Sequence, residues 1–224
     1  MTLFLRQIYL VFQKDMFAEL REARHFLSIV LFGVLLLLMF SFALSVDPDL
    51  MRKMAPGLFW LTVFFSSQIA LDHSFREEME DEQWEGLLLL GIDPKALYLG
   101  KMFSNLTFVM VLQLFLLPLM AILFDITLTA SLLFVLLLGS LGVATLGTLY
   151  SGVTAMIRER QILLPILLFP MLVPVLLASV KVTELMLAHD LFGQQVAWIK
   201  LLIVFDALFL VGSLLFSETL LDGV

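Results

Sequence analysis

The sequence has no cysteine and only three histidines among its 224 residues. The lack of cysteine excludes disulfides and thiolate metal sites. His25, His73 and His189 are far apart and are expected at different membrane faces, so no shared metal site is expected. The chain also has no Gly-x-Ser-x-Gly, no His-Glu-x-x-His and no Walker-type glycine loop. We therefore expect no catalytic residue, no resident metal or cofactor, and no ATP binding by this chain.

Charged residues are scarce, at 15% of the chain, whereas 61% of the residues are apolar and the mean hydropathy is +1.05. Soluble domains carry about 25% charged residues. A water-soluble core could not absorb so much apolar surface, so the bilayer is the expected solvent. The net charge of −7 argues against a nucleic-acid partner. Residues 1–224 are expected to form one membrane domain.

Long runs without charge predict an all-α polytopic membrane protein, since a helix needs about 20 apolar residues to cross a bilayer. Pro165, Pro170 and Pro174 predict a bent or broken fifth helix. Residues 181–200 are expected to form a short external or re-entrant helix. The six expected spans are residues 26–46, 54–71, 102–124, 126–157, 161–180 and 201–220.

The positions of lysine and arginine predict that both termini are cytoplasmic. Nine of these residues fall on the predicted cytoplasmic side: Arg6, Lys14, Arg21, Arg24, Arg76, Lys95, Lys101, Arg158 and Arg160. Four fall on the other side: Arg52, Lys53, Lys181 and Lys200.

Residues 1–25 are expected to form an interfacial helix with a basic face. At 100° per residue, the polar side chains fall within an arc of about 120°, and apolar residues lie opposite. Such a helix suits an anionic lipid surface, although an ordinary cytosolic start to the first span is the alternative. The polar arc comprises Arg6, Gln7, Gln13, Lys14, Arg21 and Arg24.

The stretch from Arg76 to Lys101 is acidic and amphipathic and lies between spans two and three. Gly91 is placed to end one helix, and Asp93-Pro94 to begin the next. Asp47-Pro48 predicts a second helix start of the same kind. The acidic face predicts a cytosolic helix that docks a soluble partner, although a solvated face without a partner fits the same spacing. That face carries Glu78, Asp81, Glu82 and Glu85.

Small residues recur at every fourth position of the fourth span, namely Ser140, Ala144, Thr148 and Gly152. Such a stripe lets helices approach closely within lipid. Asp206 is the carboxylate expected inside a span, and an ionisable residue there is a candidate polar site. Because it lies about two turns after the expected start of the sixth span, water or Lys200 is expected to reach it.

Six spans, a basic first helix and a cytosolic helix between spans two and three resemble the ABC-2 permeases. The sequence Met54-Ala55-Pro56-Gly57-Leu58-Phe59-Trp60 resembles more narrowly the CcmB family, the haem exporter membrane subunit of cytochrome c maturation. The resemblance covers the whole chain. The sequence departs from the family pattern at Glu82, where glycine is frequent, and at Gly91, where proline is frequent. The resemblance continues through Ser67, Ala70, Leu71, Phe75, Arg76, Glu77, Asp81, Glu85, Leu87 and Lys101.

The resemblance implies a bacterial inner-membrane subunit that pairs with the ATPase CcmA and with the membrane proteins CcmC and CcmD. Haem is then a cargo and not a bound cofactor, and whether two copies form a homodimer is left open. Two alternatives remain: an ABC-2 permease for another substrate, such as a lipid or glycan, and a non-transporting assembly subunit. The implied ATPase-coupling residues are Arg76, Glu77, Glu78, Asp81, Glu82 and Glu85, with Arg158 and Arg160 as a second contact.

Overall fold

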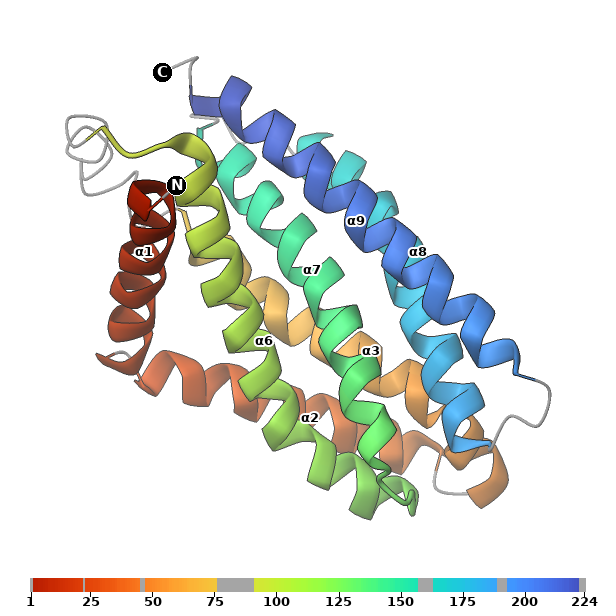
Figure 1. Ribbon diagram of the computed structural model, residues 1–224. Helices are drawn as coiled ribbons and strands as arrows, with labels where there is room; N and C mark the ends of the chain where they lie inside the picture. The colour runs from red at the N-terminus through yellow and green to blue at the C-terminus, as the bar shows by residue number, and fades with distance from the viewer. Residues whose placement is uncertain are drawn as a thin grey trace.

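The computed structural model describes residues 2–21, 23–44, 47–75, 91–156, 163–188 and 193–221. Within these ranges every regular element is a helix (Figure 1). Six of the helices are long and apolar enough to cross a membrane, which confirms the expected fold class. The helices are α1 (Thr2–Arg21), α2 (Ala23–Leu44), α3 (Pro48–His73), α6 (Pro94–Phe124), α7 (Ala130–Met156), α8 (Leu163–Leu187) and α9 (Gln194–Leu221).

The two predicted Asp-Pro helix starts are confirmed. The Asp47 carboxylate accepts hydrogen bonds from the amides of Asp49 and Leu50, both at 3.1 Å, and Pro48 opens α3. The Asp93 carboxylate accepts one from the Lys95 amide at 2.8 Å, where α6 begins. Each aspartate satisfies an amide that the first helical turn leaves free.

The chain leaves α6 through Asp125, which adopts a left-handed conformation with φ of 50°. Its carboxylate pairs with Arg52 near the start of α3. Residues 126–129 are not helical, and α7 begins at Ala130. The fourth span is therefore shorter at its start than the expected 126–157, because the left-handed residue redirects the chain before a helix can resume.

Of the expected bent or broken fifth helix, the broken form is wrong, whereas a bend stays a prediction. Pro170 and Pro174 lie inside one continuous helix, α8, which also takes in Lys181 and Glu184 up to Leu187. In hydrocarbon, backbone groups have no water to bond, so breaking the helix would leave more groups unpaired than each proline does by itself. The expected separate helix at 181–200 is likewise absent from the described residues: α8 takes its first part and α9 begins at Gln194.

The first helix also ends earlier than expected. α1 stops at Arg21 and α2 starts at Ala23, so Arg24 belongs to the first span and not to the leading helix. α1 packs mainly along the beginning of α6 (Figure 1). Gln7 and Asp15 face the protein and contact α6 or the turn that precedes it. Its position relative to a lipid surface stays a prediction.

Helix α7 lies inside the bundle and packs against α3, α6, α8 and α9. Glycines permit this close packing: a Cβ added to Gly147 would lie 2.5 Å from Leu71 of α3. Trp60, from the Ala-Pro-Gly-x-x-Trp motif, is fully buried in α3. Its indole nitrogen donates a hydrogen bond of 3.0 Å to the Thr183 hydroxyl of α8. The motif therefore lies where α3, α7 and α8 meet.

A buried polar network at both ends of the 76–90 segment

Lys101 is the charged centre of a network at the beginning of α6. Its side chain is only 2% exposed. The ammonium group lies 3.3 Å from the Asp15 carboxylate of α1 and donates to the Ser74 carbonyl. It also lies 4.9 Å from the centre of the Phe75 ring, which allows a cation–π interaction. One buried cation thus joins α1 and α6 to the last described residues before the 76–90 segment.

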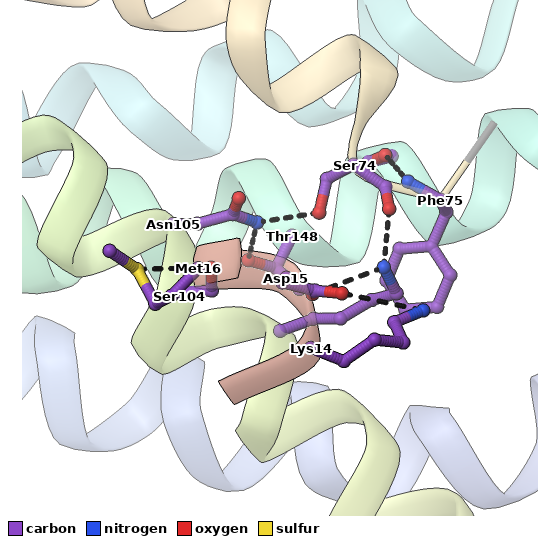
Figure 2. Close-up of polar contacts among 10 residues, drawn as sticks. Lys14, Asp15, Met16, Ser74, Phe75, Ser104, Asn105 and Thr148 are labelled. Carbon is purple, nitrogen blue, oxygen red and sulfur yellow. Dashed lines mark hydrogen bonds and ion pairs between the residues drawn. The ribbon is translucent and has the colours of Figure 1, made fainter. Parts of the chain in front are cut away.

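Asn105, one turn further along α6, extends the network to α7 (Figure 2). Its amide nitrogen donates to the Ser74 hydroxyl at 3.1 Å and to the Thr148 hydroxyl at 2.8 Å. The amide of Phe75 donates to the Ser151 hydroxyl of α7 at 3.0 Å. The chain entering the 76–90 segment is therefore held by α6 and α7 together.

The other end of the segment is held by α1. The Gln7 side chain donates to the Gly91 carbonyl at 3.2 Å and accepts from the Asp93 amide at 3.4 Å. Gly91 has φ of +64°, a conformation that glycine adopts without steric cost. α1 lies so close to α6 that a Cβ added to Gly100 would be 2.6 Å from the Val11 Cβ. The entering end also packs on α1, because Phe75 and Val11 belong to one buried cluster, so both ends of the segment contact this helix.

Electrostatics explains why Lys101 and Asp15 come together. A charge taken out of water is costly unless a counter-charge and hydrogen bonds replace its hydration. Asp15 supplies the counter-charge, and its side chain is 14% exposed. Lys14 lies 3.4 Å from the second oxygen of that carboxylate and is itself 45% exposed (Figure 2). Asp15 thus retains some access to water and a second cation, whereas Lys101 depends on its protein neighbours.

The structure leaves the predicted ATPase-coupling residues undescribed. Arg158 and Arg160 and the acidic face between α3 and α6 lie outside the described residues, so that prediction stays open. The predicted coupling residues that fall between α3 and α6 are Arg76, Glu77, Glu78, Asp81, Glu82 and Glu85.

The small residues of the fourth span all lie buried on α7. Ser140, Ala144 and Thr148 have no exposed surface, and Gly152 is buried against the Phe75 ring. Thr148 also accepts the hydrogen bond from Asn105. The C-terminal half of the stripe, Thr148 and Gly152, therefore belongs to the same interface as the polar network.

Asp206 lies deeper in the bundle than expected. Because α9 begins at Gln194, the aspartate sits about three turns inside the helix. It is 3% exposed, and neither carboxylate oxygen has a hydrogen-bond partner in the described structure. The expectation that water or Lys200 would reach it is therefore wrong. The physical reason is the longer helix, which carries the carboxylate away from the water-exposed end.

Sequence reasoning missed Asp15, Ser74 and Asn105 and counted Lys101 among the loop cations. One signal was available: at 100° per residue, Asp15 falls outside the polar arc of the first helix, on the side opposite its basic residues. A lone carboxylate on such a face indicates a buried partner. The partner itself could not be chosen from spacing.

The described residues include no group of three or more histidines, aspartates or glutamates that could hold a metal ion. The network instead consists of two ion pairs that share Asp15, together with hydroxyl, amide and carbonyl groups. Its residues lie on α1, α6 and α7 and directly after the end of α3, so the network joins these helices to the chain on either side of residues 76–90.

Comparison with known proteins assigns the family. The family described as "CcmB protein" matches residues 6–217. Heme exporter protein B of Haemophilus influenzae is 24% identical over 189 residues, which cover 84% of this chain and 86% of that protein. The protein of the same name from Pseudomonas aeruginosa is 28% identical over 178 residues, covering 77% and 74%. That of Escherichia coli is 25% identical over 95 residues, covering 42% and 43%. The chain belongs to the CcmB protein family.

Proposed function

We propose that this chain is the membrane permease subunit of an ABC transporter complex that delivers haem across the membrane for c-type cytochrome biogenesis. The match to the CcmB family over residues 6–217 carries the proposal. The name of its relatives, Heme exporter protein B, and the six helices able to span a membrane agree with it. The chain itself is not an enzyme in this proposal, and a separate ATPase subunit hydrolyses ATP.

The ATPase, a CcmA-like subunit, acts on the 76–90 segment. Its nucleotide-driven closure pushes the acidic residues, and the membrane helices rock in response. The network supports this mechanism because Ser74 and Phe75 bond to α6 and α7 before the segment, and Gln7 bonds to Gly91 after it. A push on the segment therefore reaches four helices through fixed contacts. Arg158 and Arg160 form the second contact with the ATPase.

The complex lies in the bacterial inner membrane and includes CcmC-like and CcmD-like membrane proteins. Two copies of this chain forming a homodimer is one way in which its membrane part could be built. Both termini are cytoplasmic. The arrangement of the helices supports this orientation, since the start of α1, the start of α6 and the end of α9 lie at the same end of the bundle (Figure 1). Lys95, in the first turn of α6, is a cation at that end.

Haem is the cargo of the complex, and this subunit supplies movement while a partner ligates the iron. Haem iron is commonly held by His, Cys, Met or Tyr, and this chain has no cysteine. Release of haem, or of its chaperone, follows when the helices move. Export of another substrate and a purely structural assembly role are the two alternatives, and the following experiment tests the first of them.

The test is purification of the tagged chain from its native membrane in mild detergent. We expect an ATPase and a haem-binding membrane protein to co-elute, and a deletion strain to lose holocytochrome c. Reversal of Glu78, Asp81 and Glu85 to lysine is expected to reduce ATPase recovery, because rim charges tune association. Reversal of Asp49, at the other end of α3, is the control, because it changes an acidic charge there and leaves the capping residue Asp47 in place. Normal holocytochrome in the deletion strain would refute the haem function. Unchanged ATPase recovery after the triple reversal would refute the docking site alone.

A further inference from the structure

Asp206 lies in an apolar part of the bundle. On α9 its neighbours at one helical turn are Leu202 and Phe209, and both are buried. They belong to a cluster of buried apolar residues from α3, α7, α8 and α9. The carboxylate therefore shares the inward face of α9 with side chains that cannot solvate a charge.

The facing position on α7 is Gly142. A Cβ added there would lie 2.6 Å from one oxygen of Asp206 and 2.5 Å from a methyl group of Val175 on α8. The missing side chain thus makes the space that the carboxyl group occupies. The two groups seen at this point, a glycine and a valine methyl, offer no side-chain hydrogen-bond donor to the carboxylate.

An ionised carboxylate only accepts hydrogen bonds, and when buried it needs donors or a cation. Neither oxygen of Asp206 has a donor within reach in the described structure. A metal ion is a poor candidate, since hard cations take six or more oxygen ligands. No acidic or histidine cluster exists among the described residues to supply them. A proton is the ligand that fits these surroundings.

The ionisable groups of the packed helices do not change this conclusion. Lys101 pairs with Asp15 and Lys181 with Glu184, and the Tyr98 hydroxyl donates to the Thr145 carbonyl. Lys200 precedes Asp206 by six residues, about 9 Å along α9, and points to another side of that helix. Two further ionisable side chains are described on α6 and α7. Lys95 lies in the first turn of α6, and Tyr150 follows Gly142 by eight residues, about 12 Å along α7.

We propose that Asp206 is a proton-binding site, a carboxyl group that is neutral while α7, α8 and α9 are packed around it. A carboxyl group in water is ionised at neutral pH. Protonation is therefore tied to the contact between α7 and α9: separation of these helices at Gly142 would admit water and release the proton. The site is independent of the haem proposal, because it rests only on the packing of this chain.

Infrared difference spectroscopy of the full chain in lipid nanodiscs tests the proposal directly. The spectrum of the wild type minus that of Asp206→Asn at pH 7 is expected to contain the carbonyl stretch of a protonated acid. Asp206→Leu, which keeps the branched shape, gives the same comparison if the asparagine variant does not fold. The matched control is Glu184→Gln, whose wild-type carboxylate lies 2.7 Å from Lys181 and should show only ionised bands.

Carboxylate bands for Asp206 at pH 7 would overturn the proposal. A second measurement is the melting temperature in the same nanodiscs. Asp206→Leu should melt no lower than the wild type, since no hydrogen bond to the carboxylate is lost. A clear fall, or failure of both variants to fold, would also count against a neutral acid, because it would show that the carboxylate makes a charged interaction on which the fold depends.

Discussion

Removing one partner of the Lys101–Asp15 ion pair should destabilise the bundle far more than removing an exposed pair. Breaking a buried pair costs about 3–5 kcal/mol when it leaves an uncompensated charge. Asp15→Asn leaves Lys101, 2% exposed, without its carboxylate, so this variant should fall in the upper part of that range. Lys101→Met leaves Asp15, which is 14% exposed and still 3.4 Å from Lys14, so its cost should be lower.

The chain contains its own control at the other end of α6. Arg52 and Asp125 form a pair whose side chains are 54% and 82% exposed. Exposed pairs contribute about 0–1 kcal/mol. Arg52→Met should therefore change stability little. The double variant Asp15→Leu with Lys101→Met should recover much of the loss, since apolar replacement of both partners of a buried pair is often neutral or stabilising.

The assay is thermal unfolding of the purified chain in one detergent at one protein concentration, followed by intrinsic fluorescence. The expected order of stability is wild type, Arg52→Met, Lys101→Met and Asp15→Asn, from highest to lowest. Equal melting temperatures for Asp15→Asn and Arg52→Met would refute the claim that the network is a buried electrostatic contact. Recovery of the ATPase with each variant would then show separately whether the network also affects coupling.

Three further predictions concern packing and haem. Gly100→Ala should cost about 1–3 kcal/mol because its Cβ would overlap Val11 of α1, whereas Gly212→Ala, with open space around it, should be neutral in the same unfolding assay. Ala144→Leu with Thr148→Leu should lower the melting temperature, because both sites are fully buried on α7; an unchanged value would contradict a close helix contact there. Replacing His25, His73 and His189 together with alanine should leave holocytochrome c formation largely intact, and its loss from a folded variant that keeps its ATPase would favour direct haem handling by this chain.

The sequence alone determined the class of the protein and most helix positions. Hydrocarbon offers no hydrogen bonds to the backbone, so each long apolar run must be a helix. The aspartates before Pro48 and Pro94 mark helix starts because capping is a local interaction within one turn. These features need only neighbouring residues, and they were therefore readable in advance.

Tertiary structure decided which residues meet. Lys101 and Asp15 are 86 positions apart, and Trp60 and Thr183 are 123 apart. Their contacts depend on which helices pack together. In a membrane, residues that face lipid and residues that face other helices are both apolar, so a hydrophobic pattern does not tell the two faces apart. For the same reason α8 continued through its prolines, and Asp206 came to rest against Gly142. Adjacent residues decide where a helix starts. The environment of a charged side chain is decided only by the neighbouring helices that pack around it and exclude water.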